Sequence, residues 1–264
     1  MILLADIHFG VNVPHEVGML KRAVFDDPDR LLILASDLTA SGAEQEFRWA
    51  RQFLDTLLER QVRVIVTPGN HDLHTTFGGK KEHPEQTSAR DEGKRQRRLE
   101  RMRRLCEPVF QQQEVIAHGA KDAEFDTLTH IGTHLFITLR SAHRFEDQVS
   151  LPQIAWAAAE LSKQPQLVQQ SSVHVVTHHA LWPGRNPRML VQPQFEAFLA
   201  RFRVHAFIHG HNHDYLSGSY PVGSSGYSVW RISLPTLQQH NPSREQSRGF
   251  LRWFPPVIPE FIRV

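Results

Sequence analysis

The chain lacks the features that mark secreted and membrane proteins. Its 264 residues include one cysteine, Cys106, so no intramolecular disulfide framework can form, as is usual in a reducing compartment. No apolar run approaches the roughly 20 residues that a membrane span needs. The N-terminus reaches a carboxylate at Asp6, which is too early for a secretory signal peptide. We therefore expect a cytoplasmic protein with no membrane partner.

The chain also has little net charge and no internal repeat. A formal net charge of +2 does not demand a polyanionic partner, and 40% hydrophobic with 22% charged residues is ordinary globular composition. This length and composition predict a single domain over residues 1–264, and they allow a homodimer. The unusual abundance is in histidine, with 17 residues, which favours metal or proton-transfer chemistry.

Short apolar runs alternate with amphipathic stretches along the chain. Residues 31–35 and 62–66 have the pattern of buried strands, and residues 44–60 between them place apolar side chains at helical spacing. This βαβ unit predicts a layered α/β fold. Further strands are predicted at 135–139, 173–177 and 204–208, helices at 151–163 and 193–202, and antiparallel strands after 214, such as 227–232.

A basic segment interrupts this alternation. Residues 74–92 are polar and rich in turn formers, and residues 94–104 carry seven Lys or Arg against one acid, Glu100, in a predicted helix. We interpret residues 74–108 as a basic helical insertion in the domain. Its charges form either an ordinary solvated helix face or a flap that attracts phosphate-bearing substrates.

Polar clusters follow the predicted strands, at the ends where α/β sheets place their sites. Carboxylates, imidazoles and an amide oxygen together suit a pair of divalent cations such as Mn, Fe or Zn, whereas calcium prefers oxygen ligands throughout. The clusters are Asp6-x-His8, Asp37, Gly69-Asn70-His71-Asp72, His178-His179 and Gly210-His211-Asn212-His213.

The order of these clusters, and their spacings of 29, 33, 108 and 33 residues, resemble the pattern of calcineurin-like metallophosphoesterases. The resemblance covers almost the whole chain and implies a four-layer αββα sandwich with two mixed β-sheets. It implies a two-metal centre in which a metal-bound hydroxide attacks phosphorus. The implied ligands are Asp6, His8, Asp37 and His213 for one metal and Asp37, Asn70, His178 and His211 for the other, with Asp37 shared.

The resemblance also suggests roles for the neighbours of the ligands. His71 is the candidate acid for the leaving alkoxide, and Asp72 is expected to orient it. Adjacent residues at a strand end point in opposite directions, so we expect one of His178 and His179 to bind metal and favour His178. Ser36 stands where the family usually has glycine. His174 lies inside a predicted strand and is interpreted as a structural histidine.

The substrate is predicted from weaker signals. Residues 37–42 resemble the branch that includes bacterial cyclic-nucleotide phosphodiesterases, so a small nucleotide or a similar diester is the leading substrate class. Residues 5–10 also resemble DNA-break-processing nucleases, which keeps a nuclease acting on DNA or RNA as an alternative. A phosphomonoesterase is a further alternative. An inactive binding scaffold is disfavoured because every implied ligand position holds a competent residue.

Overall fold

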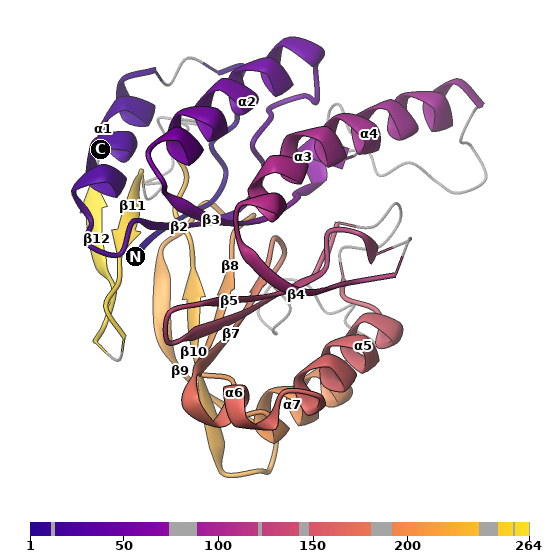
Figure 1. Ribbon diagram of the computed structural model, residues 1–264, viewed down its shortest axis with the longest axis vertical. Helices are drawn as coiled ribbons and strands as arrows, with labels where there is room; N and C mark the ends of the chain where they lie inside the picture. The colour runs from indigo at the N-terminus through magenta and orange to yellow at the C-terminus, as the bar shows by residue number, and fades with distance from the viewer. Residues whose placement is uncertain are drawn as a thin grey trace.

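Two mixed β-sheets lie face to face, with helices on their outer sides (Figure 1). The computed structural model describes residues 1–11, 14–73, 89–120, 123–142, 148–180, 192–237, 248–255 and 257–263. In the view of Figure 1, α1 to α4 lie above the strands and α5 to α7 lie below them. This arrangement confirms the predicted four-layer αββα sandwich.

The first sheet has the strand order β12-β11-β1-β2-β3. Its central strands run parallel, and the C-terminal hairpin of β11 and β12 joins the edge beside β1 in antiparallel orientation. The strands are β1 (Ile2–Leu4), β2 (Leu31–Ala35), β3 (Arg63–Thr67), β11 (Gly249–Arg252) and β12 (Glu260–Arg263). The end of the described chain therefore lies next to its beginning.

The second sheet has the order β4-β5-β6-β7-β8-β10-β9. Strands β6, β7, β8 and β10 are parallel neighbours, and antiparallel strands extend the sheet at both edges. The antiparallel prediction for residues 227–232 holds against β9 but not against β8, with which β10 pairs in parallel. The strands are β4 (Glu114–His118), β5 (Thr127–Ile131), β6 (His134–Thr138), β7 (Ser172–Thr177), β8 (Ala206–His209), β9 (Leu216–Val222) and β10 (Tyr227–Ser233).

Amphipathic helices cover the outer faces of both sheets. Apolar side chains of α1, α2 and α4 pack on the first sheet, and those of α5 and α7 pack on the second. The predicted basic helix is part of α4, whereas residues 74–88 of the expected insertion lie outside the described residues. No helix in the described ranges is both long and apolar enough to cross a membrane. The helices are α1 (Pro14–Asp26), α2 (Glu44–Glu59), α3 (Asn70–Leu73), α4 (Ala89–Gln111), α5 (Leu151–Ser162), α6 (Pro165–Gln170) and α7 (Gln192–Arg201).

The alternation of side chains along each strand explains why the strands are nearly all apolar. Ile2 and Leu4 of β1 pack under the helices, while Leu3 faces the second sheet and shares a core cluster with Phe136 and Val176. Both faces of the central strands are therefore buried, so most of their positions hold apolar residues. The predicted metal ligands lie just beyond the strand ends.

A histidine lies in the core between the two sheets. His174 is completely buried, its Nε2 lies 3.1 Å from Nδ1 of His134, and its ring contacts Trp253 edge-on. Its Nδ1 is buried and has no hydrogen-bond partner among the described residues. Burial, together with the charges of His134 and His205, holds the pKa of His174 well below its ordinary value. His174 is therefore neutral in the folded protein.

Candidate metal centre

The sequence-predicted ligands meet at the C-terminal ends of parallel strands from both sheets. Asp6 and His8 follow β1, Asp37 follows β2, and Asn70 begins α3 just after β3. From the second sheet, His178 and His179 follow β7, and His211 and His213 follow β8. The fold thus brings together residues that are up to about two hundred positions apart, such as His8 and His213, whose Nε2 atoms are 3.4 Å apart.

The backbone at these positions is strained. Five of the eight non-glycine residues with positive φ in the described part of the chain belong to the predicted ligand set: Asp6, His8, Asp37, His211 and His213, at 56°, 52°, 77°, 69° and 59°. Left-handed conformations of such residues cost on the order of 1–3 kcal/mol each and concentrate at functional sites. The left-handed backbone conformations turn these five side chains toward the candidate centre, which the regular geometry of a strand would not allow.

One group of donors consists of Asp6, His8 and His213. Their nearest ligand atoms lie within 4.8 Å of one another. Asp6 Oδ1 is 3.5 Å from Nε2 of His213 and 3.9 Å from Nε2 of His8. The other oxygen of Asp6 accepts a hydrogen bond from the backbone N–H of His211 at 3.0 Å. This bond fixes the carboxylate so that Oδ1 faces the two imidazoles.

A second group lies beside it, around Asn70. The Oδ1 atom of Asn70 is 2.9 Å from His178 Nε2 and 3.1 Å from His211 Nδ1. His178 Nε2 also lies 3.3 Å from Asp37 Oδ2. On the far side of the ring, His178 Nδ1 lies 3.1 Å from the carbonyl of Ala35, which accepts a hydrogen bond only if Nδ1 carries the proton. With Nδ1 donating to this carbonyl, Nε2 is the nitrogen that faces the site.

The two groups form a partly buried environment in which carboxylates and imidazoles stabilise each other's charged forms. Although burial opposes these shifts, His213 and His178 hold the pKa of Asp6 below its ordinary value, and His178 does the same for Asp37. Burial likewise opposes protonation of His178, but Asp37 raises the pKa of His178 to about 10. A site that stabilises a proton this strongly also favours any cation that replaces it.

The residues present fit a divalent metal. Asp6 Oδ1 is buried and has no hydrogen-bond partner within the described structure, a costly arrangement that a cation would relieve. Asp37 belongs with Asp6 and His178 to a further group of donors within 4.8 Å, so it stands between the two sets. Nitrogen and oxygen donors in this mixture suit first-row transition ions.

His71 lies at the rim of the first group. Its ring makes an edge-on contact with that of His8, at 4.9 Å between centroids. Its Nδ1 lies 2.5 Å from the carbonyl oxygen of Ala40, and its backbone N–H donates to Asp37 Oδ1 at 2.8 Å. The carbonyl of Ala40 therefore orients this ring and leaves Nε2 available to exchange a proton with a ligand.

Asp72 does not contact the ring of His71, contrary to its expected orienting role. Its buried carboxylate instead accepts hydrogen bonds from the backbone N–H groups of Leu38, Thr39 and Gly69 at 3.3, 2.8 and 3.0 Å, and from the hydroxyl of Thr39 at 2.9 Å. Burial and the charge of Asp37 raise the pKa of Asp72, while these donors oppose the shift. Asp72 therefore joins the segment that follows Asp37 to the loop that contains Gly69.

Ser36 adds a further contact to this network. Its hydroxyl donates to Asp72 Oδ2 at 3.2 Å, a bond that glycine could not make. The residue that departs from the usual family pattern therefore supports the loop of Asp37. The sequence offered no signal for this contact, because the two residues are 36 positions apart.

Both adjacent histidines face the site, so the expected opposite orientation of the two side chains is wrong, while the expectation that only one of them binds metal stays a prediction. The ligand atoms of His178, His179 and His211 lie within 4.8 Å of one another. Residues 178 and 179 lie beyond the end of β7, so strand alternation no longer applies to them. His179 is held by Ser141, whose Oγ is 3.1 Å from His179 Nδ1 and accepts the His179 backbone N–H at 2.8 Å. His178 lies 2.9 Å from Asn70 Oδ1 and 3.3 Å from Asp37 Oδ2 through its Nε2 atom.

Comparison with known proteins supports the same kind of site. The family of calcineurin-like phosphoesterases matches residues 1–215. No curated protein matches the chain. Among solved structures, the chain is similar to TT1561 of Thermus thermophilus at 9% sequence identity, over 89% of this chain and 88% of that one, with a TM-score of 0.47. A likeness this distant carries no functional inference, so the family match bears the conclusion.

Proposed function

The chain belongs to the calcineurin-like phosphoesterase family, and on that premise we propose that this metal-dependent phosphoesterase hydrolyses the phosphodiester bond of a small nucleotide or a similar diester. One observation carries the proposal. Seven side chains from the ends of five strands converge on one partly buried centre that includes two buried carboxylates: Asp6, His8, Asp37, Asn70, His178, His211 and His213. This convergence supports phosphate chemistry that depends on bound metal.

The centre is proposed to hold two divalent cations, Mn, Fe or Zn. Asp6, His8 and His213 would hold one with Asp37, and Asn70, His178 and His211 would hold the other with the same Asp37. The position of Asp37 among the donors of both groups supports this shared role. When bound, such metals polarise a phosphoryl oxygen and lower the pKa of a coordinated water.

The chain's own residues would position the substrate and move a proton. With Nδ1 of His71 donating to the carbonyl of Ala40, Nε2 is the atom that can protonate the leaving oxygen of the ester. His179, held through Nδ1 by Ser141, presents Nε2 on the His211 side of the centre. The two imidazoles would therefore contact the substrate from different loops.

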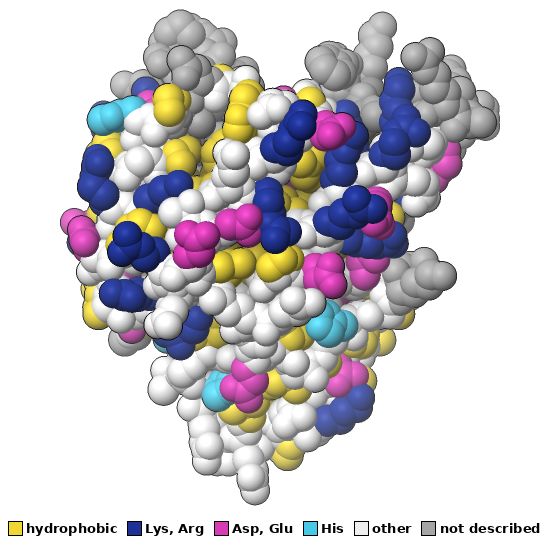
Figure 2. Space-filling view, turned by 45° about the horizontal axis from the view of Figure 1, so that its top comes forward, with side chains coloured by type: hydrophobic (Ala, Val, Ile, Leu, Met, Phe, Trp, Pro, Cys, Tyr) yellow, Lys and Arg dark blue, Asp and Glu magenta, His cyan; other side chains and the backbone are white. Residues whose placement is uncertain are grey.

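The nuclease alternative depends on α4. Four of the seven basic side chains that the structure describes on α4 form ion pairs: Arg95 with Glu92, Arg101 with Glu44, Arg103 with Glu124 and Arg104 with Glu100. Figure 2 accordingly shows basic and acidic side chains interspersed on this face. Arg98 favours the alternative, because it donates to the carbonyl of Ser41 and so places α4 against the loop that follows Asp37. Because these ion pairs reduce the positive charge that α4 could offer to a nucleic acid, we rank a small diester above a nucleic acid as the substrate.

The test is hydrolysis of bis(p-nitrophenyl) phosphate by protein that has been stripped of metal and reloaded with manganese. Wild type should turn over, and Asn70→Ala should lose at least about tenfold because a ligand to one metal is removed. Gln169→Ala, which removes an exposed amide on α6, is the matched control and should keep its activity. Activity on p-nitrophenyl phosphate or on oligonucleotides alone would replace the diester proposal by a monoesterase or a nuclease.

A further inference from the structure

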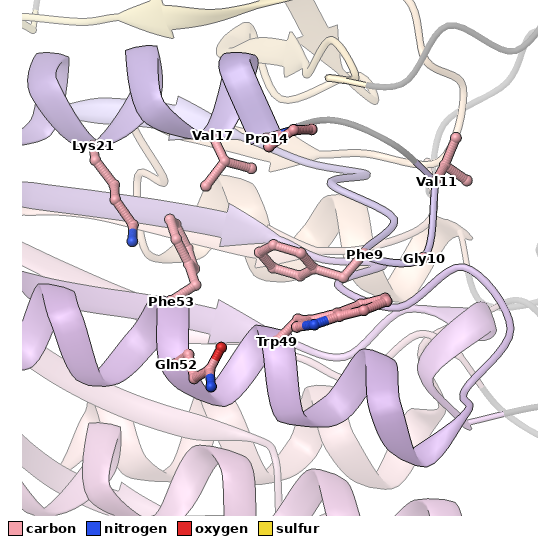
Figure 3. A pocket seen from close by; sticks show the side chains of 9 residues that line it. All are labelled: Phe9, Gly10, Val11, Pro14, Val17, Lys21, Trp49, Gln52 and Phe53. Carbon is pink, nitrogen blue, oxygen red and sulfur yellow. The ribbon is translucent and has the colours of Figure 1, made fainter.

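We propose that the crevice between α1 and α2 is a second ligand site, which binds a small planar aromatic anion. The crevice encloses about 500 Å³ and is lined by residues of both helices and of the segment that follows His8 (Figure 3). Its volume lies within the range of small-molecule pockets, about 300–1,000 Å³. Its described lining includes none of the ligands of the candidate metal centre.

Three aromatic side chains define the kind of ligand. The rings of Phe9 and Phe53 are 5.7 Å apart between centroids, and Trp49 lines the same pocket. Trp49 remains 42% exposed, which leaves a large indole surface uncovered on α2. Aromatic rings around a cavity favour flat apolar groups, which gain stacking or edge contacts in addition to burial. An aromatic ligand therefore fits better than a sugar or a flexible polar chain.

One cation sets the charge of the ligand. Among the described residues that line the pocket, only Lys21 is charged, and its Nζ lies 5.7 Å from the centroid of the Phe53 ring. No carboxylate within the described ranges forms an ion pair with it. Figure 3 shows its ammonium group turned from α1 toward the crevice. A carboxylate, sulfonate or phosphate on the aromatic ligand would complete this site.

The crevice also adjoins the candidate metal centre through Phe9. The side chain of Phe9 packs with the outer core of the first sheet, on the helix side. Its backbone N–H donates to the carbonyl of Leu38 at 2.6 Å, and its carbonyl accepts the N–H of Ala40 at 3.0 Å. A ligand that contacts Phe9 therefore rests against the strand-end loops that carry His8 and Asp37, without occupying the centre itself.

The test measures binding of 8-anilinonaphthalene-1-sulfonate to metal-stripped protein in chelator, by fluorescence and by calorimetry. Wild type should show one saturable site, and Lys21→Glu should weaken it about tenfold or more because attraction becomes repulsion. Arg22→Glu makes the same charge change at an exposed position of the same helix and should bind as wild type. Trp49→Ala, at an exposed position, should also weaken binding without unfolding the chain.

A matched ligand separates charge from hydrophobicity. N-phenyl-1-naphthylamine has the same ring systems without the sulfonate, so it should bind wild type more weakly than the sulfonate does and should bind Lys21→Glu as well as wild type. The proposal is overturned if Lys21→Glu and Arg22→Glu bind the sulfonate equally, or if the two probes bind wild type equally. Because no metal or turnover is involved, either result is independent of the proposed phosphodiesterase activity.

Discussion

Replacement of Gly69 by alanine tests the packing around the candidate metal centre most directly. A Cβ at position 69 would lie 2.0 Å from Oδ1 of Asp37 and 2.8 Å from the backbone nitrogen of Asp37, whereas ordinary van der Waals contact begins at 3.4 Å. A new rotamer of Asp37 relieves only the first clash, because the second involves backbone. The loop that carries the proposed shared ligand must therefore move.

The expected cost follows from two contributions. Overpacking in a well-packed region costs about 1–3 kcal/mol. Moving Asp37 also removes the acceptor of the His71 backbone N–H, a bond of 2.8 Å, at a further 1–3 kcal/mol or so. We expect the free energy of unfolding of Gly69→Ala to fall by roughly 2–6 kcal/mol, and its manganese affinity to fall at least about tenfold.

The assay is urea unfolding of the chelator-treated protein at pH 7.5, together with a calorimetric manganese titration of the folded variant. Gly18→Ala is the matched control, because nothing lies within 4 Å of a Cβ at that position in α1. Alanine there should stabilise the protein by about 0.5–1 kcal/mol through helix propensity. Stability within about 0.5 kcal/mol of wild type and unchanged manganese affinity for Gly69→Ala would refute the packing argument.

Other predictions concern charge, pH and metal. Asp72→Asn should leave at least one buried backbone N–H without an acceptor and lower the free energy of unfolding by about 1–3 kcal/mol. The control Asp55→Asn changes a side chain that is 42% exposed and should change this free energy by less than about 0.5 kcal/mol. Equal melting temperatures of the two variants would contradict a stabilising role of the hydrogen bonds of Asp72. Below its ordinary pKa, His174 binds a proton in the unfolded chain but not in the folded protein, so the free energy of unfolding should fall by about 1 kcal/mol between pH 6.5 and 5.5. His174→Gln should remove this contribution to the dependence of stability on pH. Identical dependences for wild type and His174→Gln would contradict the assignment to His174. A chelator should lower the melting temperature of wild type more than that of Asn70→Ala, since a bound metal stabilises only the folded state; equal shifts would mean that Asn70 is not a ligand.

Local patterns in the sequence determined the elements that carry the site. The apolar run at Leu31–Ala35 coincides with β2, and the helix predicted at 44–60 ends one residue later than α2 does. These elements were readable because side chains that are buried on one or both faces must repeat with the period of the element. The polar clusters stood out for the same reason, since they interrupt apolar runs where a strand stops. The segments missed, such as α1 and the strands β4 and β5, have a weaker or shorter pattern.

The tertiary structure alone decided which polar groups touch. The sequence predicted that Asp72 orients His71, but its carboxylate binds the backbone of Thr39 and Gly69 instead. The sequence also predicted that adjacent residues at the end of β7 point in opposite directions, but the ligand atoms of His178 and His179 lie together near His211. Contacts such as Asn70 with His178, 108 positions apart, depend on the left-handed turns at Asp37 and His211, where regular periodicity has ended. The sequence by itself therefore determined the chemistry of the site and its place at the strand ends, because both depend on residue type and local period. The paths of the loops determined which groups are in contact, because those paths are set by packing between segments far apart in the chain.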